Sequence, residues 1–317
     1  MVIARRDTCF ACCGTNRHVI WREDDFAVQR CAGCYAEWVE GSAAGDLGYS
    51  HQQTVTRDGF ERHRTRQFAK DRYWSSKRAE RFARYLKERR VPKGRLLDVG
   101  CSDGAFIVLA EELGWEPTGV ELNEFAIMLA KSWAHLPVLA GDVSDKALFP
   151  PASYDLVTLW GVVEHCPHPD VLLRACAEIV RPGGYIALET PNTQGLFRDL
   201  AYRVATRFPA FQRPFHEMLG SGHVAWYSAS SIRATAEGIG LDVLHIKGSR
   251  NATGILTYRF RRLALAPRLF FQAGTAILNL LAVPLGRPNQ LLACFQRPSV
   301  PTHGSAESRQ PPLHVSN

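Results

Sequence analysis

The stretch from Leu96 to Phe106 reads LLDVGCSDGAF and decides the fold. Its apolar start predicts a strand that is buried on both faces, as in a parallel sheet covered by helices. Gly100 and Gly104 predict a turn where the backbone can approach a ligand closely. Apolar residues then recur at helical spacing from Ala105 to Leu113. We therefore expect a strand, a ligand loop and a helix start, which is where open α/β sheets bind their ligands.

An acidic residue follows this loop at a spacing that is typical of nucleotide-binding α/β folds. The next predicted strand, Pro117 to Glu121, ends in an acid about twenty residues downstream, where it can accept both hydroxyls of a ribose. The loop is not the full dinucleotide fingerprint, because position 102 is Ser. Together the two features predict a ligand that carries a nucleoside.

Strand and helix signals alternate after this point, which predicts a doubly wound parallel α/β sheet. With 317 residues and 46% hydrophobic content, the chain is long enough for one large α/β domain with appendages. The predicted elements are a helix at 125–133, strands at 138–140 and 154–160, a helix at 171–180 and a strand at 185–190.

Four of the nine cysteines form two C-x-x-C knuckles separated by eighteen residues. This spacing matches a tetrahedral structural zinc site, because each knuckle supplies two thiolates from one turn. The alternatives are four unrelated core residues or a redox pair, and Cys13 could replace its neighbour as a ligand. The predicted zinc ligands are Cys9, Cys12, Cys31 and Cys34.

The formal net charge of +7 is concentrated in residues 57–90, which hold thirteen Lys or Arg against five Asp or Glu. One interpretation is a helix that lays Trp74, Phe82, Tyr85 and Leu86 on the sheet and turns its cations to solvent. The other is a surface for nucleic acid or anionic lipid. The N-terminus has no apolar signal-peptide core, so we expect a cytoplasmic protein with reduced thiols.

The motifs LLDVGCSDGAF, GVELNE, GDV, YDLVTLWGVVEH, VRPGGYIALETPN and SGHVAWYS, in this order, resemble a class I S-adenosylmethionine-dependent methyltransferase. Within that class the chain is similar to the ubiquinone O-methyltransferase-like group, whose members often carry an N-terminal zinc-ribbon segment. The resemblance covers residues 90–250 in detail. It implies a Rossmann-like, doubly wound, seven-stranded sheet of six parallel strands and one antiparallel strand, closed by a hairpin of strands at 241–247 and 290–296.

The resemblance also implies which residues hold the cofactor. Gly100, Cys101 and Gly104 would face its methionine part, and Asp98 would brace this loop. Glu121 would bind the ribose hydroxyls.

The adenine end would be bound by the following loops. Asp142 would accept a hydrogen bond from the adenine amino group, and Leu122 and Val143 would enclose the base. Trp160 would line the pocket. Asp142 is alternatively a helix cap, and Trp160 alternatively a core aromatic residue.

Candidate catalytic residues follow the strand at 154–160. His165 is a candidate general base oriented by Glu164, because imidazole titrates near neutral pH. The pair could alternatively only hold its loop together. His223 is a second candidate base or a structural hydrogen-bonding residue. Gly161 and His168 replace acids of metal-dependent relatives, which argues against a catalytic magnesium ion.

We therefore predict a zinc-ribbon-like segment at 1–40, a linker at 41–56 and a basic helical segment at 57–90. The methyltransferase domain would span 91–297, with inserts at 192–220 and 248–289, and 298–317 would be a disordered tail. The first insert resembles an acceptor lid and carries Arg198, Arg203, Arg207 and Arg213. The second contains the uncharged stretch 269–286, which predicts a packed helix or hairpin, a membrane contact through 259–287, or, least of all, a membrane span.

The predicted function is O-methylation of a small-molecule, sugar or lipid-linked acceptor. The alternatives are a nucleic-acid methyltransferase that reads its substrate through the ribbon and the basic helix, a C- or N-methyltransferase, and a binding protein without chemistry. The sequence does not identify the acceptor, and we expect nucleic acid not to be the partner.

Overall fold

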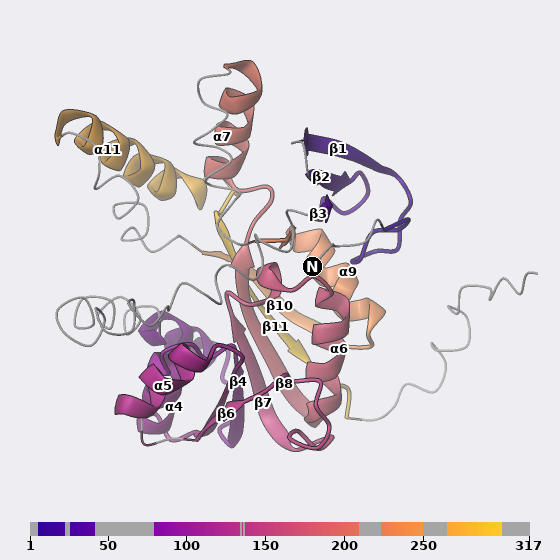
Figure 1. Cartoon of the computed structure of the whole chain (residues 1–317), viewed down its shortest axis with the longest axis vertical. Coiled ribbons are helices and arrows are strands. Elements are labelled where there is room, and N and C mark those ends of the chain that lie inside the picture. The colour runs from indigo at the N-terminus through magenta and orange to yellow at the C-terminus, as the bar shows by residue number, and fades with distance from the viewer. Residues whose placement is uncertain are drawn as a thin grey trace, which may run out of the picture.

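The computed structural model describes residues 6–22, 26–41, 79–133, 135, 137–208, 223–249 and 265–299 (Figure 1). The predicted linker, the basic residues before 79, including Trp74, and nearly all of the predicted tail lie outside these residues. Arg213, Arg259, Arg261 and Arg262 also lie outside them.

A seven-stranded sheet forms the centre of the protein, in the order β10-β11-β8-β7-β4-β5-β6. β11 is antiparallel to both of its neighbours, and the remaining pairs are parallel. The predicted sheet of six parallel strands and one antiparallel strand is therefore confirmed. Its strands are β4 (Arg95–Val99), β5 (Glu116–Glu121), β6 (Val138–Ala140), β7 (Tyr154–Trp160), β8 (Val180–Pro191), β10 (Asp242–Ser249) and β11 (Gln290–Gln296).

Helices cover both faces of this sheet, so successive strand residues enter different cores. Leu96 packs with Phe82 of a helix at residues 79–88 and with Phe106, whereas Leu97 packs in the core that contains Leu173 and Ile232. This explains the unbroken apolar run in β4. The helices are α4 (Ala105–Glu112), α5 (Glu124–Trp133), α6 (Pro169–Ile179), α7 (Leu196–Arg207), α9 (Ala229–Gly238) and α11 (Leu265–Ala282), with a short 3₁₀ turn η3 (Val163–His165).

The helix at 79–88 lies on the sheet with its aromatic side inward. Phe82, Tyr85 and Leu86 are buried, and Arg81 forms an ion pair with Glu189 of β8. The structure therefore supports the interpretation of a helix packed on the domain for the described end of the basic segment.

A second, four-stranded sheet has the order β1-β2-β3-β9. Its first three strands are N-terminal, but β9 comes from a segment nearly two hundred residues later in the chain. Phe10 contacts the rings of both Trp38 and Tyr227, and these residues belong to the main core. The N-terminal segment is therefore built into the domain. The strands are β1 (Arg17–Arg22), β2 (Phe26–Cys31), β3 (Glu37–Gly41) and β9 (Ala225–Trp226).

The two predicted inserts contribute α7 and α11, which contact each other and project from the same end of the central sheet (Figure 1). α7 begins shortly after β8 ends, so this end carries the carboxyl ends of the parallel strands. Within the described residues, no helix is long and apolar enough to cross a membrane.

Candidate active site

The loop between β4 and α4 is a tight turn fixed by backbone contacts. The amides of Gly100 and Cys101 both donate to the carbonyl of Val120, at 2.8 and 3.2 Å, and the amide of Gly104 donates to the carbonyl of Cys101 at 2.9 Å. Gly100 and Gly104 have φ angles of +67° and +77°, a region where a side chain is strained. Gly104 is the N-cap of α4 and has no capping side chain, and the amide of Ala105 donates instead to the Asp103 carboxylate of the loop at 3.1 Å.

Glu121, at the end of β5, joins this loop to the next one. One carboxylate oxygen, Oε2, accepts from the amide of Ser102 at 3.0 Å. The other, Oε1, accepts from the amides of Leu122 and Asn123 at 2.8 and 2.9 Å. The carboxylate is thereby fixed beside the glycine loop, and its predicted contact with ribose hydroxyls stays a prediction.

Asp98 lies beneath the loop, fully within the protein. It is 3% exposed and accepts a hydrogen bond of 2.5 Å from the Thr158 hydroxyl of β7. Burial raises the pKa of Asp98 to about 8, although the Thr158 hydrogen bond acts in the opposite direction. Burial also raises the pKa of the neighbouring Cys101 thiol, which lies in a core cluster with Ile107. Cys101 therefore contributes its backbone to the loop, and its side chain belongs to the core.

The residues predicted to hold adenine lie on the next two loops. Asp142 accepts from the amide and the hydroxyl of Ser144, at 2.8 and 2.7 Å, through the single oxygen Oδ1. Asp142 thus caps a turn, and no helix follows it in the described residues before β7, so the helix cap named as its alternative is not formed. Leu122 is 55% exposed, whereas Val143 is buried in the main core. Whether Asp142, Leu122 and Val143 enclose a base stays a prediction.

Trp160 ends β7 inside an aromatic cluster. Its ring stacks on Phe82 at a centroid distance of 4.2 Å and meets Phe106 edge-on at 5.4 Å. The ring packs in the core as its alternative expected, and whether Trp160 also lines the cofactor pocket stays a prediction. Its indole nitrogen is buried without a hydrogen-bond partner in the structure, which leaves one donor for a ligand at this strand end.

Glu164, His165 and His223 meet beyond the end of β7. Their candidate ligand atoms all lie within 4.8 Å of one another, and the two imidazole rings meet edge-on with centroids 4.7 Å apart. Glu164 is buried, and His165 and His223 are half-buried. The sequence predicted Glu164 and His165 as neighbours, and the structure adds His223 to the same group.

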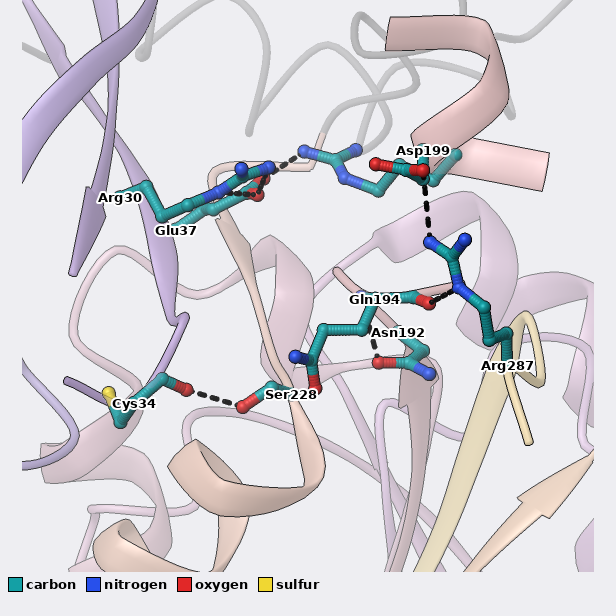
Figure 2. Close-up of polar contacts among 9 residues, drawn as sticks. Arg30, Cys34, Glu37, Asn192, Gln194, Asp199, Ser228 and Arg287 are labelled. Carbon is teal, nitrogen blue, oxygen red and sulfur yellow. Dashed lines mark hydrogen bonds and ion pairs between the residues drawn. The ribbon is translucent and has the colours of Figure 1, made fainter. Parts of the chain in front are cut away.

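The segment after His223 links this group to the N-terminal sheet. The amide of Val224 donates to the carbonyl of Glu164 at 2.8 Å. The carbonyl of Val224 accepts from the amide of Val39 in β3 at 3.0 Å. Ser228 caps α9, and its hydroxyl also donates to the carbonyl of Cys34 (Figure 2). The sequence offered no signal for this pairing, because β9 has only two residues.

Buried charge holds α7 against the same sheet. Glu37 of β3 is fully buried and forms ion pairs with Arg30 and with Arg198 of α7, and Figure 2 shows it beside Arg30. Arg203 pairs with Asp199 one helical turn away. Two of the arginines predicted to suit an acidic acceptor therefore have partners within the protein.

Two further groups at the strand ends were not singled out by sequence reasoning. Glu189 of β8 is 3% exposed, is the register partner of Trp160, and pairs with Arg81. Tyr227 is buried, and its hydroxyl has no hydrogen-bond partner in the structure. Burial raises the pKa of Tyr227 well above its ordinary value. The sequence could have pointed to Glu189 because it is an acid within an apolar strand, as Asp98 is in β4.

The four cysteines of the two knuckles lie together. The sulfur atoms of Cys9 and Cys34 are 3.5 Å apart, those of Cys12 and Cys31 are 3.6 Å apart, and all four lie within 4.8 Å of one another. Zn–S bonds of about 2.3 Å in a tetrahedron place sulfur atoms about 3.8 Å apart, so the arrangement fits zinc. The hydrogen bond between Cys9 and Cys34 lowers the pKa of the Cys9 thiol and raises that of Cys34, and burial raises the pKa of Cys12. Cys13 is exposed and lies outside the cluster.

The family described as "Methyltransferase domain" matches residues 60–246. The ubiquinone biosynthesis O-methyltransferase of Bordetella avium is 34% identical over 103 residues, which cover 31% of this chain and 43% of that protein. The protein of the same name from Saccharophagus degradans is 34% identical over 116 residues, which cover 35% and 49%. The chain thus spans less than half the length of these curated relatives.

One solved structure shows a similar fold. It is the complex between the Haloferax volcanii Trm112 methyltransferase activator and a putative methyltransferase. The match has a TM-score of 0.50 and 15% identity, and it covers 80% of this chain and 97% of the matched chain. At this identity the likeness concerns the fold alone.

Proposed function

The chain belongs to the methyltransferase-domain family, and from that membership we propose that it is an S-adenosylmethionine-dependent methyltransferase. The acceptor atom we propose is a hydroxyl oxygen of a small-molecule, sugar or lipid-linked compound. The similarity to the ubiquinone biosynthesis O-methyltransferases supports oxygen as the acceptor atom. The acceptor itself is not implied by those names, because the chain spans less than half of each relative.

The observation that carries the proposal is the position of the Glu121 carboxylate. Three backbone amides from two loops fix it at the carboxyl end of β5, next to the glycine loop. A carboxylate offers about four lone-pair sites, so it can accept a ribose hydroxyl in addition to these amides. The unpartnered indole nitrogen of Trp160 adds a further donor at the same edge of the sheet.

The cofactor, when bound, supplies an electrophilic methyl group on a sulfonium sulfur. In-line transfer of that group would depend on alignment of the acceptor oxygen, which the residues around the site would provide. The hydroxyl proton must leave in the same process. We assign this proton to the imidazole of His165, with Glu164 orienting the ring and His223 as the second candidate base.

We also propose that the four-cysteine cluster binds structural zinc. A tetrahedral site with four thiolate ligands has no open position for a substrate, so the metal would stabilise the N-terminal sheet rather than take part in chemistry. Its four ligands come from two turns that surround β1 and β2. Metal analysis of gently purified protein should give about one zinc per chain, and a value far below one would contradict the site.

Transfer of label from the cofactor tests the function directly. The full chain is incubated with methyl-labelled S-adenosylmethionine and extracts of the native host, and the Glu164→Gln variant serves as the control. We expect label in a small hydroxyl compound with the wild-type chain and little with the variant. Label in a nuclease-sensitive fraction would support the nucleic-acid alternative, and transfer that is equal in both samples would contradict our assignment.

A further inference from the structure

α11 exposes apolar side chains where a surface helix ordinarily exposes polar ones. Leu269, Ile277, Leu280 and Leu281 are between 45% and 56% exposed. At 3.6 residues per turn these four positions share about one third of the helix circumference. Val283 and Leu285, in the turn that follows, are 39% and 59% exposed. Several large apolar side chains on one face mark an interaction site.

The opposite side of α11 is anchored to the domain by polar contacts. Asn279 is buried and accepts from the side-chain amide of Asn289 at 3.5 Å. Behind the helix, the amide of Arg287 donates to the carbonyl of Ala282 at 2.7 Å, and the Arg287 side chain pairs with Asp199 of α7. Figure 2 shows this last pair. These contacts fix the helix with its apolar face turned outward.

The charge of the surrounding sequence identifies the partner. From Val243 to Ala306 the chain contains no Asp or Glu, but it contains eight Lys or Arg. Within that stretch, residues 269–286 carry no charge and follow Arg268 directly. Two of the eight cations, Lys247 and Arg287, pair with Glu88 and Asp199 within the protein. A second copy of this surface would repel the first, whereas an anionic phospholipid surface attracts each cation by about 1 kcal/mol.

We infer that the outer face of α11 binds the surface of an anionic phospholipid bilayer. The helix lies in the plane of the interface, with Ile277 and Leu280 in the acyl boundary. α11 stands at the sheet end that carries the candidate active site (Figure 1). Resting on the proposed function, this position suits an acceptor that has a lipid tail.

Vesicle flotation of the full chain tests the surface without measuring methyl transfer. The vesicles contain phosphatidylcholine with about one third phosphatidylglycerol, and pure phosphatidylcholine vesicles are the comparison. The test variant is Ile277→Glu with Leu280→Glu. The matched control is Met128→Glu with Val171→Glu, because these two side chains are 49% and 55% exposed on other helices. Circular dichroism and S-adenosylhomocysteine calorimetry check that both variants are folded.

We expect the wild type and the control to float with anionic vesicles, and the test variant to bind at least tenfold less. Absence of wild-type binding overturns the inference, as does an equal loss in both variants. The inference is also overturned if high salt abolishes vesicle binding but the test variant binds like the wild type. In that case Ile277 and Leu280 would not be inserted into the bilayer. A wild-type dimer that the test variant converts to a monomer, without vesicle binding, assigns the face to a second copy instead. Cofactor binding measured on the same samples separates failure of this inference from failure of the proposed function.

Discussion

The backbone amide of Val39 donates a hydrogen bond of 3.0 Å to the carbonyl of Val224, the residue that follows His223. Because the Val224 amide donates in turn to Glu164, one peptide segment connects the N-terminal sheet to the candidate catalytic group. The cysteine knuckle holds the same segment through Ser228 and Ser230, both of which donate to the carbonyl of Cys34. The N-terminal segment is thus a wall of the site.

Loss of the knuckle should therefore loosen the segment around His223. We expect Cys31→Ser to lower the zinc content and to increase amide hydrogen exchange at residues 224–228, while S-adenosylhomocysteine binding is retained. Cys13→Ser is the matched control, because Cys13 lies outside the cluster. Unchanged exchange at 224–228 in a metal-free variant would show that the coupling does not exist.

Glu37 should be one of the costliest acids to remove. It is fully buried between Arg30 and Arg198, and truncation leaves two cations in poorly solvated positions. Breaking a buried ion pair costs about 3–5 kcal/mol. We expect Glu37→Ala to lower the free energy of unfolding in urea by this amount, and Arg203→Ala, in an exposed pair, by less than about 1 kcal/mol. Equal effects of the two variants would contradict the burial argument.

Substitutions in the catalytic group should separate binding from turnover. We expect His165→Ala to reduce label transfer by about 10²–10⁴-fold, the usual contribution of a general base. His223→Ala should have the smaller effect if His165 carries the proton. Cofactor affinity should be unchanged in both variants, and the exposed His135→Ala is the control. A reversed order of the two histidines would assign the base to His223.

Asp98 should make the free energy of unfolding fall as the pH rises towards neutrality. Its pKa of about 8 in the folded protein exceeds the ordinary 3.8, so the folded state holds a proton that the unfolded chain has released between these values. Stability contributed by this group is therefore lost as pH rises from about 4 to 8, by at most about 1.4 kcal/mol per pH unit. Asp98→Asn should remove that slope in urea unfolding at pH 6, 7 and 8. An identical slope in the variant would mean that Asp98 is ionised in the folded protein.

The central sheet was predictable because its evidence is local. Apolar runs and glycine turns such as LLDVGCSDGAF depend on neighbours in the sequence, and β11 occupies the predicted residues 290–296. The four-cysteine cluster was predictable for the same reason, since each knuckle is a single turn.

Contacts between segments that are far apart in the sequence could not be predicted from it. The pairing of β3 with β9 involves two register pairs and no special residue type. Nothing in the sequence distinguishes Arg198, which is paired with Glu37, from a solvent-exposed arginine of an acceptor lid. Trp160 also shows this limit, because a strand-end aromatic residue reads the same whether it faces a ligand or, as here, packs against Phe82.

Calorimetric titration with S-adenosylhomocysteine tests the central claim, the cofactor site at Glu121, most directly. We expect one binding site per wild-type chain and at least tenfold weaker binding for Glu121→Ala, because the loss removes the proposed ribose acceptor and the anchor of the Ser102 amide. Glu124→Ala, an exposed acid three residues later, should bind like the wild type. Absence of binding by the folded wild-type chain, or equal affinity in Glu121→Ala, would contradict the account.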